Sequence, residues 1–208
     1  MFSITKHITL RDGSFFLNNE KATKIEEGAN FKEISKKLYQ SLEVDYPKFY
    51  KMDNLSKTAF LSSELLLGAH TFNCEEEKIG LFISNKASSL ETDEAYYSKT
   101  FGEDEFQANP ALFVYTLPNI MMGELCIRHK IKGEQSMWVS DNLDATFVSK
   151  YVNLLYSEKL IESAIVGWID FYKDEPEVML CLVENNTDNQ AIAFNEKNLI
   201  NIYQRLKS

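Results

Sequence analysis

Cysteine and histidine supply many of the nucleophiles, bases and metal ligands of proteins, and this chain has three of each. They are Cys74, Cys126, Cys181, His7, His70 and His129. The cysteines lie far apart and show neither C-x-x-C spacing nor a histidine-rich neighbourhood, so the sequence predicts no metal centre and no cofactor. His129 follows Cys126 by three residues in a predicted helix, which could bring the two side chains together. A histidine at a helix end beside Lys130 is the simpler interpretation.

The charge of the chain argues against nucleic acid as a partner. Its 22 Lys and Arg face 31 Asp and Glu, for a net charge of −9, and no basic cluster is interleaved with aromatic residues. A local patch of Arg128, Lys130 and Lys132 could still meet an acidic carrier protein, with a solvated helix end as the alternative.

The remaining composition is that of an ordinary soluble domain. Hydrophobic residues make up 44% of the chain, and no apolar stretch is long enough to span a bilayer. The first ten residues lack the pattern of a secretory signal, and the scattered cysteines favour a reducing compartment, so we expect a cytoplasmic protein. No repeat or linker is visible, and we expect residues 1–208 to form one domain.

Apolar periodicity alternates between strands and helices along the chain. Residues 2–17 predict two short strands around Asp12-Gly13, and residues 160–171 and 177–184 predict two more strands around a turn at residues 174–176. Asp141 is the expected N-cap of a helix that runs to Tyr156, with Asp144 in its first turn. Other strands are expected at residues 78–85 and 136–140, and other helices at 31–42, 52–67, 91–100, 119–130 and 195–207. Gly68 ends the helix at 52–67, and Asn109-Pro110 starts a further helix that Pro118 breaks. This order indicates an α/β fold with a mostly parallel mixed sheet flanked by helices.

Four segments in the same order resemble the amino-terminal half of the β-ketoacyl synthases, which have a thiolase-like fold. They are MDNLSKTAFLSSELLLG, KIGLFIS, NPALFVYTLPNIMMGELCIRHKIKGEQ and LIESAIVGW. The third is the most specific, because its Leu-Pro-Asn lies fourteen residues before Gly133 with the expected strand and helix after it. The resemblance covers roughly residues 45–185, and it implies one thiolase-like half.

The resemblance breaks down at the catalytic position. In the family, the nucleophilic cysteine lies nine residues beyond the glycine that matches Gly133, and in this chain that position is Asn142. An amide cannot attack a thioester, and Ser140, the one alternative nucleophile nearby, has no evident base. The family's two catalytic histidines belong to a carboxyl-terminal half for which the chain has no room before Ser208. We therefore assign no catalytic residue and favour a protein that is not an enzyme.

The resemblance also implies an interface and an acyl-binding wall. Ketoacyl synthases form dimers through the strand before the nucleophile, which here is Ser136, Met137, Trp138, Val139 and Ser140. The Leu-Pro-Asn helix contributes to the acyl tunnel of the neighbouring subunit, so Phe113, Tyr115, Met121 and Met122 become candidate substrate-binding residues. Alternatively, these four side chains fill the core of the chain itself.

These expectations favour a chain-length-factor-like subunit, a non-catalytic partner of an active condensing enzyme in fatty-acyl, polyketide or polyene biosynthesis. An acyl carrier protein is a further candidate partner. The alternative is a homodimeric pseudo-enzyme that binds an acyl chain or a carrier protein. A third hypothesis is a residual decarboxylase in which Asn142 binds an enolate, although without the histidines little would stabilise the developing charge.

Overall fold

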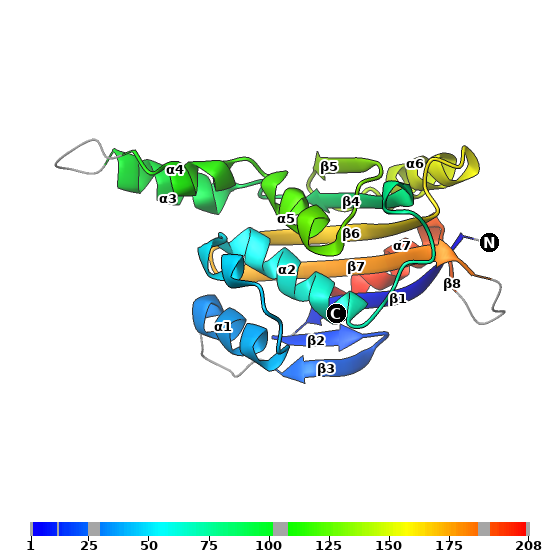
Figure 1. Cartoon of the computed structure of the whole chain (residues 1–208), viewed down its shortest axis with the longest axis horizontal. Helices are drawn as coiled ribbons and strands as arrows, with labels where there is room; N and C mark the ends of the chain where they lie inside the picture. Colours follow the sequence, from blue (N-terminus) through cyan, green and yellow to red (C-terminus); the bar gives the residue numbers. More distant parts are fainter. Residues whose placement is uncertain (1, 12, 25–29, 102–107, 187–191, 207–208) are drawn as a thin grey trace.

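The structure of the chain is a computed structural model that describes residues 2–11, 13–24, 30–101, 108–186 and 192–206. Its centre is one eight-stranded mixed sheet with the order β3-β2-β1-β7-β6-β4-β5, in which β8 also pairs with β1 (Figure 1). The strands are β1 (Phe2–Arg11), β2 (Ser14–Leu17), β3 (Glu20–Lys24), β4 (Ile79–Asn85), β5 (Gln135–Val139), β6 (Ser163–Tyr172), β7 (Glu175–Asn185) and β8 (Ile192–Ala193).

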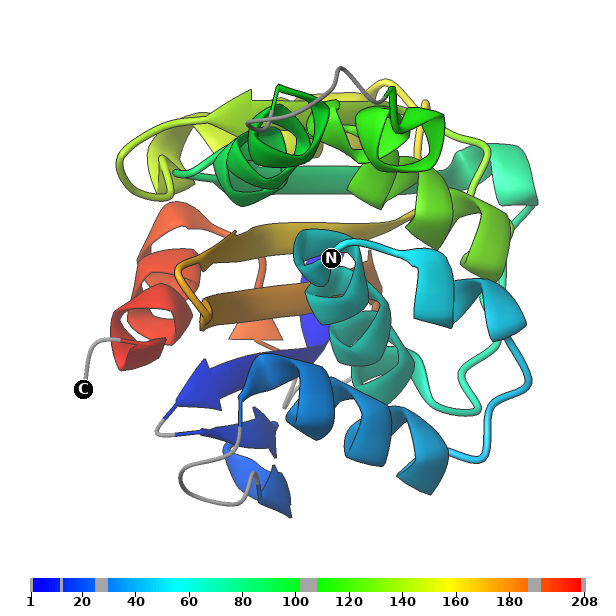
Figure 2. The same cartoon turned by 90° about the vertical axis from the view of Figure 1, so that its left-hand side faces the viewer.

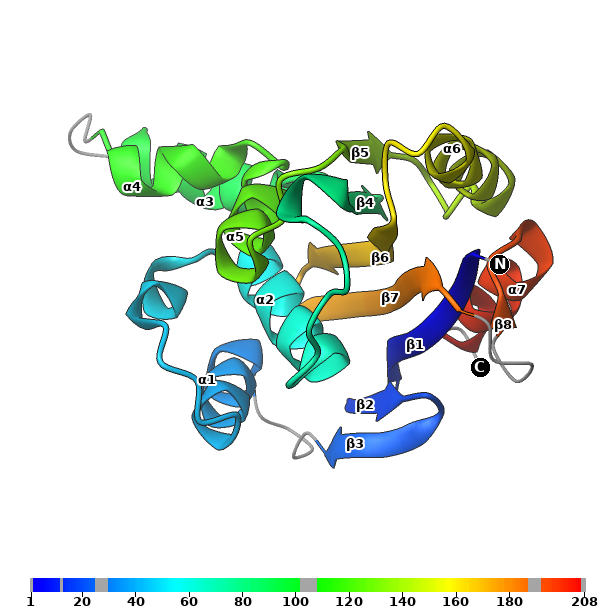
Figure 3. The ribbon, with the colours of Figure 1, turned by 45° about the vertical axis from the view of Figure 1, so that its right-hand side comes forward.

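Helices cover both faces of this sheet, with α1, α2 and α5 on one side and α6 and α7 on the other (Figures 2 and 3). The strand pattern produces the two layers, because alternate side chains point to opposite faces. Along β4, Leu81 and Ile83 pack toward α2, whereas Phe82 packs toward α6. The helices are α1 (Phe31–Ser41), α2 (Asn54–Leu67), α3 (Leu90–Thr100), α4 (Pro110–Phe113), α5 (Ile120–His129), α6 (Ala145–Ser157) and α7 (Glu196–Tyr203).

A β-bulge interrupts the alternation of β1. The pairing of β1 with β7 shifts between Ile4 and Lys6, which leaves Thr5 as the extra residue. Before the bulge, Phe2 and Ile4 belong to the core under α6 and α7, whereas Ile8, also at an even position, belongs to the core under α2. The extra residue therefore exchanges the two faces of the strand.

The mixed sheet flanked by helices agrees with the expected fold class, but the expectation that it would be mostly parallel is wrong. Among the strand pairings of the described residues, only β4 with β5 and β4 with β6 are parallel. β6 and β7 form an antiparallel hairpin that turns at Lys173 and Asp174, both with positive φ, and not at residues 174–176. Pro176 lies inside β7. The structure also adds β3 and β8, which the sequence did not predict.

The predicted start of α6 also needs correction. Asp144, not Asp141, is its N-cap, and the Asp144 side chain accepts a hydrogen bond of 2.9 Å from the backbone N–H of Phe147. The helix therefore begins at Ala145, and residues 140–144 form a loop between β5 and α6.

Helices α3 and α4 form an arm that extends past the end of the sheet (Figure 1). The side chain of Asn109 caps α4 by accepting from the N–H of Leu112, and Pro110 occupies the first turn, as the sequence predicted. In the described ranges, no single helix has the length and apolar character of a membrane span. A bent pair, Pro110–Thr116 with Ile120–His129, meets that criterion only jointly, at an angle of 95°.

Candidate functional site

The position where the resemblance places a nucleophile lies in the loop between β5 and α6. Asn142 is exposed there, three residues before the first residue of the helix. The Ser140 hydroxyl donates to the backbone oxygen of Asn142 over 2.7 Å, and the Ser140 N–H donates to the backbone oxygen of Asn85 over 2.9 Å. Ser140 thus stabilises the loop, and a hydroxyl held by a backbone carbonyl is not an activated nucleophile.

The three histidines are hydrogen-bonded in other parts of the molecule. His7 lies 3.3 Å from Asn19, His70 lies 3.0 Å from Glu184, and His129 lies 2.8 Å from Ser63. None of these partners belongs to the loop that carries Asn142. The described residues therefore provide no His-activated nucleophile at this loop.

The end of β4 lies beside this loop and carries an unusual buried amide. Asn85 is fully buried, its Nδ2 donates to the backbone oxygen of Ser88, and its Oδ1 has no hydrogen-bond partner among the described residues. Asp170, at the neighbouring end of β6, accepts from the backbone N–H groups of Lys86 and Ala87. Together these residues fix the chain as it leaves β4, at the carboxyl edge where α/β folds often place sites. Neither residue stands out in the sequence.

The predicted interface strand, residues 136–140, corresponds to β5 and forms one edge of the sheet. Since the Ser140 N–H points to β4, alternation directs the backbone groups of Met137 and Val139 to the open side. Val139 is 56% exposed, and Ser136, Met137 and Trp138 are half-buried. An edge of this kind can accept another strand.

The four candidate acyl-binding residues divide into an exposed one and three buried ones. Phe113 is 53% exposed on the arm, whereas Tyr115, Met121 and Met122 belong to the core shared with α2. The Tyr115 hydroxyl donates to Oε1 of Glu124 over 3.1 Å, and Nζ of Lys48 lies 2.8 Å from the other oxygen of Glu124. Desolvation by burial raises the pKa of Tyr115, so its phenol stays protonated.

A polar contact joins α2 to the end of α5. Arg128 donates to both carboxylate oxygens of Glu64, over 2.6 and 3.0 Å, and Nε2 of His129 lies 2.8 Å from Oγ of Ser63. The same nitrogen is 3.7 Å from Glu64, so one ring nitrogen faces both the hydroxyl and the acid. A catalytic triad would need the acid on the opposite ring nitrogen. The group is therefore a structural clamp between two helices.

The contacts around the end of α5 test two ideas from the sequence, the pairing of Cys126 with His129 and the basic patch of Arg128, Lys130 and Lys132. His129 contacts Ser63, and burial raises the pKa of Cys126 to about 11, so the pair of Cys126 and His129 is not an active thiolate with its base. In the proposed basic patch, Arg128 is engaged by Glu64, and Lys132 lies 2.7 Å from Glu76. The patch is therefore partly neutralised by carboxylates of the chain itself.

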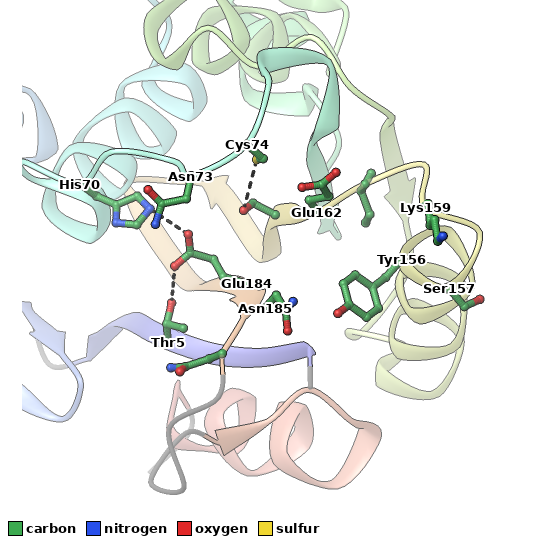
Figure 4. A pocket seen from close by; sticks show the side chains of 13 residues that line it. Thr5, His70, Asn73, Cys74, Tyr156, Ser157, Lys159, Glu162, Glu184 and Asn185 are labelled. Atoms are coloured by element: carbon green, nitrogen blue, oxygen red, sulfur yellow. Dashed lines mark hydrogen bonds and ion pairs between the residues drawn. The ribbon is translucent and has the colours of Figure 1, made fainter.

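A cavity lies at the opposite edge of the sheet, where β4 and β6 begin (Figure 4). Its volume is about 690 Å³. The start of β6, the end of β7, the bulge of β1, the loop after α2 and the end of α6 all contribute lining residues. The amino edge of the parallel strands thus holds a hollow that the sequence analysis did not predict.

A hydrogen-bonded network fixes one wall of this cavity. The Thr5 hydroxyl donates to Oε2 of Glu184 over 3.0 Å, and Nε2 of His70 lies 3.0 Å from Oε1 of the same carboxylate. Elsewhere in the lining, the Cys74 thiol donates to Oγ of Ser163 over 3.5 Å. Desolvation raises the pKa of Cys74, which makes it a poor nucleophile at neutral pH. Across the described ranges, no three His, Cys, Asp or Glu side chains are placed to hold a metal ion.

Only weak signals in the sequence point to this cavity. His70 and Asn73 follow Gly68, which ends α2 with a positive φ of 53°, and Glu184 and Asn185 follow the apolar run of β7. Polar residues directly after an apolar element are typical of a strand or helix end that opens into a loop. Nothing in the sequence indicated that these two ends would meet.

Comparison with known proteins identifies the fold. No protein-family model and no curated protein matches the sequence. Among solved structures, the ishigamide ketosynthase/chain length factor aligns with 91% of this chain and 63% of its own, at 15% identity and a TM-score of 0.66. A β-ketoacyl synthase from Burkholderia phymatum STM815 aligns with 89% of this chain and 59% of its own, at 11% identity and a TM-score of 0.60.

A third similar structure is a ketosynthase in complex with its chain length factor from Xenorhabdus doucetiae. It aligns with 89% of this chain and 79% of its own, at 14% identity and a TM-score of 0.55. The chain therefore has the thiolase-like fold of ketosynthases, as the sequence resemblance implied. It spans less than two thirds of the length of the ishigamide and Burkholderia proteins.

Proposed function

We propose that the chain is a non-catalytic, chain-length-factor-like subunit that pairs with an active β-ketoacyl synthase in fatty-acyl, polyketide or polyene biosynthesis. One observation carries the proposal: on a ketosynthase fold, the position expected for the nucleophile is Asn142, exposed in a loop whose neighbouring hydroxyl is held by a backbone carbonyl. An amide there cannot form the acyl-enzyme bond that condensation requires. The chemistry then belongs to the partner.

The surface proposed for pairing runs along one side of the molecule. The arm, β5 and α6 lie along this side (Figure 1), and it includes the open backbone groups of Met137 and Val139. Phe147 and Leu154 of α6 are apolar and exposed beside that edge. Large exposed apolar patches mark interaction sites, and an edge strand supplies hydrogen bonds for pairing.

We further propose that Phe113 contacts the acyl channel of the partner, with Tyr115, Met121 and Met122 packed beneath it. The Tyr115–Glu124 hydrogen bond supports this arrangement, because it fixes the segment between the arm and α5. An acyl carrier protein would then deliver substrates to the active subunit. We also propose that residues 1–208 act as one domain in the cytoplasm. The pairing of β1 with β7, which joins the two ends of the chain in one sheet, supports the single domain.

The test is the mass of the complex in solution, measured by light scattering for the chain alone and mixed with condensing enzymes of the same genome. The proposal expects a stable one-to-one mixed complex and a change in product length when the chain is omitted. A tight dimer of the chain that ignores these enzymes would contradict it. Release of carbon dioxide from a malonyl thioester by the pure chain would also contradict a non-catalytic role.

A variant pair can locate the interface. Val139→Pro removes the backbone N–H of residue 139, which is a donor on the open side of β5. It leaves the hydrogen bond from the Ser140 N–H to β4 in place. This variant should therefore abolish the mixed complex. Val139→Thr keeps the donor and the β-branched shape and should pair normally. Equal pairing by both variants, with unchanged thermal stability, would show that β5 is not the interface.

A further inference from the structure

The cavity at the amino edge of the sheet is distinct from the loop that carries Asn142, although the end of α6 contributes Tyr156 and Ser157 to its lining. It lies where β6 begins at Ser163, whereas the loop with Asn142 follows the carboxyl end of β5. Because β4, β5 and β6 run parallel, these are opposite edges of the sheet. The cavity therefore does not include the position expected for the nucleophile.

The cavity has the features of a built site. Thr5 reaches it because the β-bulge redirects this residue from the ladder of β1, and bulges often reorient side chains beside sites. Glu184 is then fixed by Thr5 on one oxygen and by His70 on the other. An acceptor held by two donors from different elements is preorganised, which lowers the entropic cost of binding a ligand.

The other lining groups form hydrogen bonds and contribute little net charge. Asn73 and Asn185 bring side-chain amides, which donate and accept, and Ser163 brings a hydroxyl. The lining carries two carboxylates, Glu162 and Glu184, against one ammonium, Lys159. A lining of this kind suits ligands whose groups both donate and accept, and it disfavours anions.

Tyr156 supplies an aromatic surface. Its ring stacks on Phe2 at a centroid distance of 4.1 Å, which fixes its plane, and it extends toward Asn185 and the cavity (Figure 4). A fixed aromatic ring with carboxylate and amide groups around it can hold a molecule that has an apolar C–H face and several hydroxyls at its edge.

We propose that this cavity binds a small neutral polyhydroxylated ligand, with the chemistry of a mono- or disaccharide. The volume of about 690 Å³ lies within the range of small-molecule sites, roughly 300–1,000 Å³. Glu184 accepts hydroxyl hydrogens, Asn73 pairs with a hydroxyl at the rim, and Tyr156 packs against the ring.

The experiment is a titration of the ¹⁵N-labelled full chain with maltose, followed by amide chemical shifts. Putrescine and glucuronate serve as charged probes. The expected result is saturable shifts confined to residues 70–74, 156–163 and 184–186, with a dissociation constant on the order of 1 mM, and weaker responses to both charged probes. If neutral sugars cause no saturable shift, or if putrescine or glucuronate binds more tightly than maltose at the same residues, the proposal is wrong.

Three variants show whether the side chains act as described. Asn73→Ala, on the exposed rim, and Glu184→Gln should each weaken maltose binding by roughly tenfold, the effect of impairing one hydrogen bond. Glu158→Gln makes the same charge change beside the cavity, outside its lining, and should leave binding unchanged. Unchanged binding in both Asn73→Ala and Glu184→Gln would overturn the assignment. Thermal unfolding of each variant distinguishes a lost contact from a lost fold.

Discussion

Nε2 of His129, the last residue of α5, lies 2.8 Å from Oγ of Ser63 in α2. Burial lowers the pKa of His129 to about 4, from 6.5 for an unperturbed histidine. Well above pH 6.5 the imidazole is neutral in both the folded and the unfolded chain, so it adds no pH dependence there. Between pH 6.5 and pH 4 only the unfolded chain binds the proton, and stability falls as the pH falls.

This difference predicts a loss of about 3 kcal/mol in the free energy of unfolding between pH 7 and pH 4 from His129 alone. Urea unfolding at pH 7, 6, 5 and 4 measures it. Because carboxylates also titrate in this range, His129→Gln is the control, and the difference between the two proteins isolates the histidine. Parallel pH profiles for both proteins would show that His129 is not desolvated as described.

The cap of α6 predicts unequal effects for two neighbouring aspartates. Asp144 accepts a hydrogen bond from the N–H of Phe147, so Asp144→Ala should destabilise the protein by about 1 kcal/mol. Asp141 lies earlier in the loop and is exposed, and Asp141→Ala should change stability by less than about 0.5 kcal/mol. Thermal unfolding of both variants measures the difference. Equal effects would place the helix start at Asp141 after all.

Gly167 lies where the backbones of β6 and β7 approach closely. A Cβ atom at Gly167 would come within 1.9 Å of the backbone oxygen of Met179, and a backbone atom cannot move aside as a side chain can. Gly167→Ala should therefore cost about 3 kcal/mol or more. Gly123 in α5 has open space around the same atom, so Gly123→Ala should stabilise the protein by about 0.5–1 kcal/mol. A tolerated Gly167→Ala would contradict the packing of this hairpin.

The three thiols should react with iodoacetamide in a defined order. Cys74 lines the cavity and is partly exposed, so it should be labelled first, although more slowly than an unhindered thiol because its pKa is raised. Cys126, with a pKa of about 11, should follow, and Cys181 is buried and should be labelled only after unfolding. Mass spectrometry of timed samples at pH 8 gives the order. Rapid labelling of Cys181 in the folded protein would contradict its burial.

Local signals in the sequence predicted most of the elements. Gly68 and Asn109-Pro110 set the end of α2 and the start of α4, and the apolar run of residues 78–85 predicted β4. Whether neighbouring strands run parallel or antiparallel was harder to predict, because it depends on how the strands are connected. β7 returns to the middle of the sheet and pairs with β1, whose residues lie 168 to 183 positions earlier in the chain, and no short segment encodes this pairing.

The sequence placed Asn142 at the amino end of a helix capped by Asp141, whereas the structure has Asn142 in the loop before this helix, three residues from its first residue. The cavity at the other edge could not be predicted in the same way. Thr5, His70 and Glu184 come from segments far apart in the sequence, and Thr5 reaches the cavity only through a bulge. A bulge results from the balance of pairing and packing along a whole strand, and the residues around Thr5 carry no signal for it.

Because of the bulge at Thr5, the two halves of β1 pack under different helical layers, and this matters for how the protein unfolds. Phe2 and Ile4 are anchored in the layer under α6 and α7, whereas Ile8 and Leu10 are anchored under α1 and α2. If α7 detaches in a local opening, the first half of β1 loses its cover and the second half keeps it. Amide hydrogens on the two sides of Thr5 should then exchange with solvent at different rates, and this single strand would report on the separate stabilities of the two helical layers.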